Sequence, residues 1–135
     1  MPKIFTSKTQ KIGEIGEKTA VRFLMKHGFY ILDKNYTKKW GEIDIIAKKS
    51  NKLYFIEVKS ISCDNLDLVS QETSQYRPED NMHPCKRMRM SRTIQTYLLD
   101  KRVSEDTEWQ VDLLVIYLDF QKNTSRVKVV SDVIL

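Results

Sequence analysis

The residues that decide the fold are Gly41–Lys59, with the sequence GEIDIIAKKSNKLYFIEVK. Two segments rich in apolar and β-branched residues, Gly41–Lys48 and Lys52–Ile61, flank Ser50 and Asn51, a pair typical of a tight turn. This pattern predicts an antiparallel β-hairpin.

The predicted register of this hairpin brings two acidic residues together. A turn centred between Ser50 and Asn51 places Asp44 opposite Glu57, with their Cβ atoms roughly 5 Å apart. Two carboxylates so close repel each other, so either a neighbouring cation neutralises them or a divalent metal uses them as ligands. The same register places Glu42 opposite Lys59 and gives the other face of the hairpin only apolar residues: Ile43, Ile45, Ala47, Tyr54, Ile56 and Val58.

A helix before the hairpin adds a third carboxylate. The helix is predicted to begin near Ser7 and to end at His27, because Gly28 suits the left-handed position that follows a helix. Glu17 lies on its apolar stripe and therefore faces the core, where an unpaired charge costs several kcal/mol. We expect Lys59 or a metal to compensate it.

The acidic residues have two interpretations. They could form only an exposed charge cluster at the end of a sheet, and Glu14, one turn before Glu17, could take the place of Glu17 or simply be solvated. The convergence of Asp44, Glu57 and Lys59 with Glu17 from a separate element favours a functional site, because clustered charges with perturbed pKa values mark such sites.

The rest of the chain predicts one further helix and three further strands. Phe29–Asn35 is predicted to be a short strand, Ser62–Pro84 a long polar loop, and Cys85–Arg102 a helix. Gln110–Tyr117 is apolar enough for an interior strand, and Ser125–Ile134 alternates like a final strand. The fold class is therefore α/β, in the order αβββαββ, with a parallel crossover and a mixed central sheet flanked by helices.

Length and composition favour a single soluble domain. The 135 residues are 41% hydrophobic, and 23 Lys and Arg outnumber 18 Asp and Glu to give a net charge of +5 and a pI near 9.2. This surplus favours a polyanionic partner. Cys63 and Cys85 form neither a zinc motif nor a disulfide framework, which predicts a reducing cytoplasm. The polar start and the lack of a long apolar run predict neither secretion nor membrane contact.

Basic residues gather at two places and are candidates for contact with nucleic-acid phosphates. The alternative is that they only solvate a helix face, where positive charges at a helix start oppose its dipole. The candidates are Lys86, Arg87, Arg89 and Arg92 at the start of the second helix, and Lys38 and Lys39 before the first acidic strand.

The acidic pattern resembles a known nuclease signature. Asp44 followed by Glu57-Val58-Lys59 is similar to the D and E-x-K residues of the PD-(D/E)XK nuclease superfamily, without the proline of that name. The chain is more closely similar to the YraN family of small bacterial proteins, from Gly13 to Ile116. That similarity rests on GEIDIIA, on FIEVK and on further matching residues: Gly16, Glu17, Ala20, Phe23, Leu24, Gly28, Ile31, Leu32, Asn35, Tyr36, Pro84, Lys86, Arg87, Tyr97, Leu98, Val111 and Asp112.

The resemblance implies a fold and a reaction. It implies a restriction-endonuclease-like fold, with residues 1–135 as one nuclease-like domain and 62–84 as its long polar loop. The YraN family resembles archaeal Holliday junction resolvases and is regarded as a family of predicted endonucleases that hydrolyse phosphodiester bonds in DNA, with branched or junction DNA as a candidate substrate. This chain departs from the family at Ser60 and Ile61, where threonine and arginine are common.

The resemblance also implies roles for individual residues. Asp44 and Glu57, with the carbonyl of Val58 and with Glu17, would hold Mg²⁺ or Mn²⁺. Lys59 would position the attacking water, so that the catalytic set is Glu17, Asp44, Glu57 and Lys59.

Two other classes of function stay open at this point. One is a nucleic-acid-binding module that keeps the fold but is catalytically inactive, and the other is a protein-interaction subunit that recruits a partner through the long loop. A homodimer is a further expectation, because a four-way junction presents two equivalent strands for incision.

Overall fold

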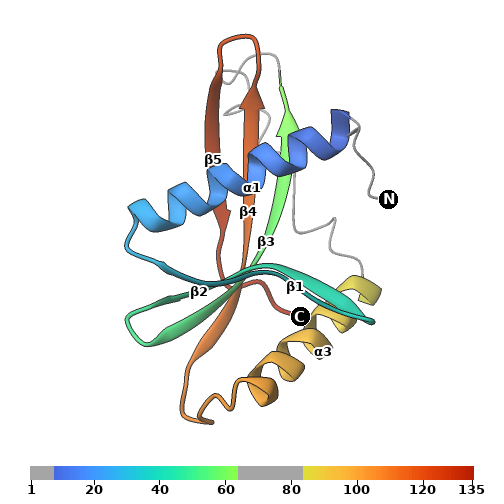
Figure 1. Cartoon of the computed structure of the whole chain (residues 1–135), viewed down its shortest axis with the longest axis vertical. Coiled ribbons are helices and arrows are strands. Elements are labelled where there is room, and N and C mark those ends of the chain that lie inside the picture. Colours follow the sequence, from blue (N-terminus) through green and yellow to red (C-terminus); the bar gives the residue numbers. More distant parts are fainter. Residues whose placement is uncertain (1–7, 64–83) are drawn as a thin grey trace, which may run out of the picture.

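The computed structural model describes residues 8–63 and 84–135, which form two helices and five strands (Figure 1). These elements are α1 (Lys8–Lys26), β1 (Tyr30–Lys38), β2 (Gly41–Lys49), β3 (Lys52–Ser62), α3 (Pro84–Asp100), β4 (Trp109–Asp119) and β5 (Thr124–Val130).

The five strands form one mixed sheet in the order β1-β2-β3-β4-β5. All neighbouring strands are antiparallel except β3 and β4, which are parallel as the predicted crossover requires. The helices cover opposite faces, and the β1–β2 hairpin runs across the direction of the other three strands (Figure 1). This confirms the predicted α/β, restriction-endonuclease-like fold and its element order.

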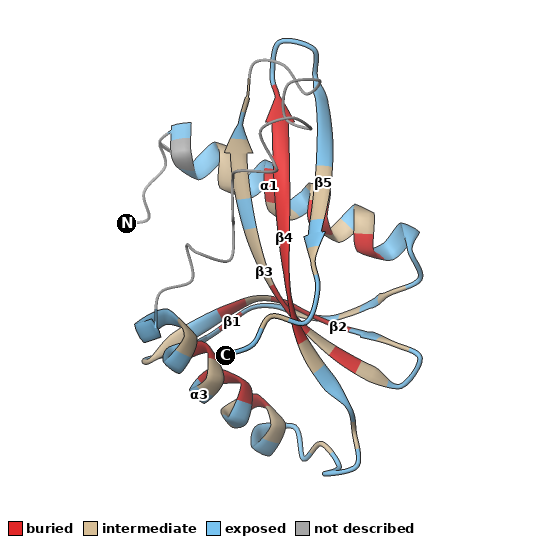
Figure 2. Ribbon diagram, turned by 180° about the vertical axis from the view of Figure 1, so that it is seen from behind, coloured by how far each residue is buried: buried red, intermediate tan, exposed pale blue. Residues whose placement is uncertain are grey.

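Each helix encloses its own part of the core. On one face, α1 packs Ala20 and Leu24 against Ile45, Ile56 and other residues of the sheet. On the other face, α3 packs its own apolar residues against Phe55. Both faces of β4 are covered, and its residues from Val111 to Asp119 are buried (Figure 2), which confirms the interior strand. The α3 residues in this core are Met90, Ile94 and Tyr97.

The hairpin turn has the predicted register. Ser50 and Asn51 both adopt positive φ, at 52° and 64°, as the two central residues of a type I′ turn do. Lys49 therefore pairs with Lys52, and the pairing continues up to Ile45 opposite Ile56, which is the predicted register. Beyond that pair, β2 and β3 are no longer partners, so the predicted opposition of Glu42 and Lys59 is wrong.

The faces of β2 change where it separates from β3. Ile45 belongs to the core under α1, whereas Ile43 belongs to the core under α3, so its predicted place on the same face as Ile45 is wrong. This change of face accompanies an irregularity in the partner strand β1. Asn35 has a left-handed φ of 53°, and it separates Lys34, which pairs with Ile45, from Tyr36, which pairs with Ile43 and packs under α3.

Gly41 brings α3 against the start of β2. A Cβ atom at this position would lie 2.6 Å from Thr93 Oγ1 and 3.1 Å from the Arg89 carbonyl oxygen. Because both atoms belong to a packed helix, only glycine allows this close approach. The first half of α3 is thereby held over the end of β2 that carries Asp44.

The boundaries of several elements differ from their predictions. β1 continues to Lys38 instead of ending at Asn35, and β5 ends at Val130 instead of Ile134. α3 begins at Pro84, where a proline costs no helical hydrogen bond. The predicted loop 62–84 lies mostly outside the described residues, since only its flanks belong to β3 and α3. Within the described ranges, neither helix is both long and apolar enough to span a membrane.

Candidate functional site

Asp44 lies at the point where β2 and β3 separate. Its Oδ2 accepts a hydrogen bond of 2.8 Å from the main-chain N–H of Val58, so the carboxylate takes the place of a strand partner. Glu57 lies beside it, within reach of a hydrogen bond between the two carboxyl groups. The predicted meeting of these two acids therefore exists, although it lies just beyond the paired part of the hairpin.

The surroundings of Asp44 favour its protonated form. Burial raises the pKa of Asp44 from 3.8 to about 8, and the neighbouring charge of Glu57 and a smaller effect of Glu17 act in the same direction. The hydrogen bond from the Val58 N–H lowers the pKa and offsets part of this rise. At neutral pH the protonated form of Asp44 is therefore favoured. A cation between the carboxyl groups would allow both to be ionised.

A lysine from α3 reaches the same pair. Lys86 Nζ forms an ion pair with Glu57 Oε2, and the Glu57 side chain is only 14% exposed. The sequence predicted that a cation or a metal would compensate the acids, but it assigned Lys86 to phosphate contact and expected Lys59 to be the neighbour. No local signal could identify Lys86, because its contact with Glu57 depends on how α3 packs on the sheet.

The acids open into a cleft between the sheet and α3, with a volume of about 400 Å³. Its walls carry both charges: acids from β2 and β3, and bases from the first turns of α3. Glu42 at its edge accepts a hydrogen bond of 2.9 Å from the Thr37 hydroxyl. The lining residues are Gly41, Glu42, Asp44, Glu57, Cys85, Lys86, Arg89 and Met90.

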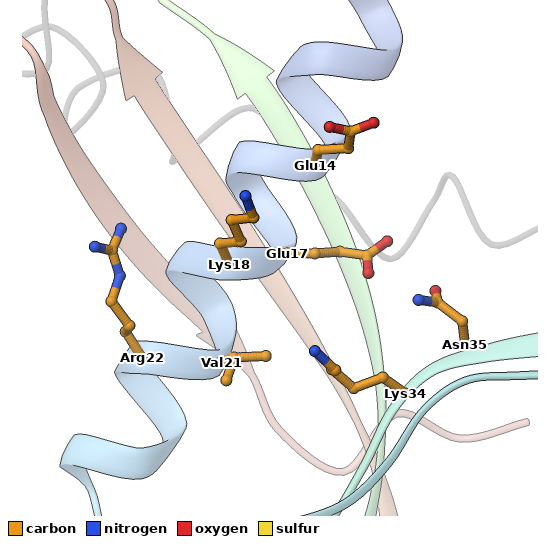
Figure 3. A pocket seen from close by; sticks show the side chains of 7 residues that line it. All are labelled: Glu14, Glu17, Lys18, Val21, Arg22, Lys34 and Asn35. Atoms are coloured by element: carbon orange, nitrogen blue, oxygen red, sulfur yellow. The ribbon is translucent and has the colours of Figure 1, made fainter. Parts of the chain in front are cut away.

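Glu17 approaches the acids from the α1 side of the sheet. Its side chain points from α1 toward Asn35 (Figure 3), whose side chain hydrogen-bonds to it, in a second cleft of about 610 Å³. Burial raises the pKa of Glu17, Asn35 lowers it, and the charges of Glu42 and Glu57 raise it further. Glu17 is thus an electrostatic neighbour of the pair but does not line their cleft. The sequence did not single out Asn35 as its partner.

Lys59 and Val58 follow Glu57 on β3. Lys59 shares a strand face with Glu57 because side chains alternate, and it is exposed. Within residues 8–63 and 84–135, the Lys59 ammonium forms no ion pair. Val58 packs its side chain on the α1 core and uses its N–H to hold Asp44.

The other basic candidates lie along α3 and the β1–β2 turn. Arg92 stacks on Trp40, with its guanidinium carbon 4.1 Å from the ring centroid, and so joins the two predicted basic regions. Lys38 lies over the ring of Tyr36, at 5.1 Å, and Lys39 is exposed. Arg89 faces the acidic cleft, whereas Arg87 and Arg92 line a neighbouring pocket.

The carboxylate oxygens of Asp44 and Glu57 suit a hard divalent cation that completes its coordination with other ligands. Within the described part of the chain, no group of three or more acidic, histidine or cysteine side chains could hold a metal by itself. Mg²⁺, however, commonly uses one or two carboxylates and completes its shell with water and substrate phosphate. Asp44 and Glu57 are such a pair, and a bound cation would replace the proton that the raised pKa of Asp44 favours.

The fold and this site define the class of the protein: a restriction-endonuclease-like α/β domain whose acidic pair lies where two central strands separate. Residues 16–131 match the model of the uncharacterised protein family UPF0102, so the chain belongs to this family, which is the YraN family. The function of the family is not established.

Curated relatives from bacteria support the same assignment. The chain is 39% identical over 107 residues to a UPF0102 protein of Campylobacter jejuni, with 79% of this chain and 84% of the relative covered. It is 40% identical over 107 residues to a UPF0102 protein of Alkaliphilus oremlandii, covering 79% and 83%. A UPF0102 protein of Campylobacter fetus is 42% identical over 101 residues, covering 75% and 79%.

Proposed function

We propose that this protein is a metal-dependent endonuclease that hydrolyses phosphodiester bonds in DNA, using Mg²⁺ or Mn²⁺. The observation that carries the proposal is the meeting of Asp44 and Glu57 in a cleft whose opposite wall is basic. An oxygen-rich pair suits a hard cation, and a basic wall suits a phosphate backbone.

Asp44 and Glu57 would hold the cation, with the Val58 carbonyl as a further oxygen ligand. When bound, the cation would lower the pKa of a coordinated water and neutralise charge on the scissile phosphate. The Val58 N–H fixes the orientation of the Asp44 carboxylate, so little reorganisation is needed when the ligand arrives. Glu17, from the other face of the sheet, would add negative potential and orient the ligand shell.

The basic side chains would act on the substrate. Lys59 would position the attacking water and stabilise the charge that develops on the phosphate. Lys86 pairs with Glu57 now, and a cation bound to Glu57 would release it toward a substrate phosphate in the same cleft. Arg89 lines that cleft and is a second candidate for phosphate contact.

The Lys86–Glu57 ion pair also favours a second candidate function. An acid that is already neutralised by a lysine can serve packing alone, as in a nucleic-acid-binding module that is catalytically inactive. In that case the protein would bind DNA through its basic residues without any requirement for metal.

The proposal also includes a cellular compartment and an oligomeric state. Cys63 and Cys85, which form no disulfide with each other, fit a reducing cytoplasm. A homodimer would match the two equivalent strands of a branched substrate.

The test is a cleavage assay on the purified full chain. We expect Mg²⁺ or Mn²⁺ to support cleavage of at least one of three labelled DNA substrates, namely duplex, single-stranded and four-way junction, and EDTA to stop it. The products should carry 5′-phosphates. DNA binding without cleavage in either metal would instead support the inactive binding module.

A further inference from the structure

A second pocket lies on α3, beside the acidic cleft, and its charge differs from that of the cleft. It has a volume of about 510 Å³, and its α3 residues fall on one helical stripe. Among the described residues that line it, Arg87 and Arg92 have charged side chains and none has an acidic one. The full lining is Pro84, Arg87, Met88, Ser91, Arg92 and Leu135.

One guanidinium group of this pocket is fixed by stacking, and the other has a buried donor without an acceptor among the described residues. Arg92 is fixed against the ring of Trp40. Arg87 Nε is buried and, within the part of the chain that the structure describes, has no hydrogen-bond acceptor. The indole N–H of Trp40 is buried and equally without an acceptor among these residues. Buried donors without acceptors are rare in folded proteins, so these donors suit a ligand that supplies acceptors.

An anion with several oxygens fits these donors. Arginine presents a planar fork of donors that matches carboxylate or phosphate, and Ser91, one helical turn after Arg87, can donate a further hydrogen bond. A phosphate is favoured here because Lys86 and Arg89, on the adjacent stripe of the same helix, line the cleft that we assign to a phosphodiester. A continuous nucleic-acid backbone supplies phosphates to both places.

We propose that the pocket of Arg87, Ser91 and Arg92 binds a backbone phosphate of the nucleic acid, outside the cleavage cleft. The inference rests on the proposed function for the identity of its ligand. It divides the basic residues of α3 into two sets: Lys86 and Arg89 serve the scissile region, and Arg87 and Arg92 hold a neighbouring phosphate. The second set would contribute affinity without touching the reacting atoms.

The test measures binding without cleavage. A fluorescein-labelled DNA duplex is titrated with the full chain in EDTA over a series of salt concentrations, and its anisotropy is followed. We expect Arg87→Gln to weaken binding about tenfold and to reduce the slope of log affinity against log salt by about 0.9, the value for one lost phosphate contact. Arg87→Lys keeps the charge and should keep the slope. Arg92→Gln should reduce the slope as Arg87→Gln does.

Arg102→Gln is the matched control, because Arg102 is an exposed arginine just after the far end of α3. It should leave the slope and the affinity unchanged. Thermal melting of each variant excludes unfolding as the cause of weaker binding.

Three results would overturn the proposal. The first is a wild-type chain that does not bind the duplex, and the second is an Arg87→Gln slope equal to that of the wild type or of Arg102→Gln. The third is weaker binding of Arg87→Gln to poly-glutamate with unchanged DNA binding, which would assign the pocket to an acidic protein. Cleavage in Mg²⁺ is scored separately, so a chain that passes the binding test but never cuts DNA refutes only the nuclease.

Discussion

Asp44→Asn is expected to reduce metal-dependent DNA cleavage at least ~1000-fold, which corresponds to about 4 kcal/mol of transition-state stabilisation. Asparagine has nearly the same shape, and its carbonyl oxygen can still accept the hydrogen bond from the Val58 N–H. The substitution therefore removes the ligand charge and leaves the backbone arrangement intact. Initial rates of cleavage at saturating Mg²⁺ measure the effect, and Glu57→Gln should cause a comparable loss.

The control for this substitution is Asp106→Asn. Asp106 is an exposed residue in the turn between α3 and β4, where its main-chain N–H donates a hydrogen bond to the Ser104 hydroxyl. This variant should cleave at the wild-type rate. If Asp44→Asn and Glu57→Gln both keep more than a tenth of the wild-type rate, the acidic pair is not the catalytic centre.

Asp44→Asn should also change how stability depends on pH. In the folded chain, burial and the charge of Glu57 raise the pKa of Asp44 from 3.8 to about 8, so the folded state holds this proton more tightly than the unfolded state does. The stabilisation is complete below about pH 4 and is lost as the pH rises through about 8. The free energy of unfolding of the wild type should therefore fall across this range in EDTA.

Asparagine has no such proton to lose. At pH 9 the Asp44→Asn variant should be more stable than the wild type by more than about 1.4 kcal/mol, the free energy of a single pKa unit. Urea denaturation at pH 5, 7 and 9 measures the difference, with Asp106→Asn as reference. Parallel pH profiles for wild type and Asp44→Asn would show that the Asp44 carboxyl group has an ordinary pKa.

The sequence predicts the hairpin and its register because the responsible interactions are local. The turn residues Ser50 and Asn51 fix which residues face each other, and the alternation of apolar residues fixes which face is buried. These two facts bring Asp44 and Glu57 near each other, although the acids lie one position beyond the last paired residues, Ile45 and Ile56. The parallel pairing of β3 with β4 is also predictable, because a helix between two strands imposes the crossover.

What could not be predicted depends on contacts between distant segments or on a single backbone angle. The Lys86–Glu57 ion pair requires α3 to pack over β2, which Gly41 permits through its lack of a Cβ atom. The change of face at Ile43 requires the left-handed Asn35 in β1, which a pattern of alternating residues does not reveal. Glu17 was expected to face the core with Lys59 or a metal as its partner, but it lines a cleft and its partner is Asn35.

The central claim is that Asp44 and Glu57 together bind one divalent cation, and titration calorimetry with Mn²⁺ tests it most directly. At pH 7, in two buffers with different ionisation enthalpies, we predict one Mn²⁺ per chain and the release of up to about one proton, because Asp44 is protonated before the ion arrives. Asp44→Asn and Glu57→Gln should each abolish the binding heat. No binding to the wild type, or equal binding to Asp44→Asn, would contradict the claim.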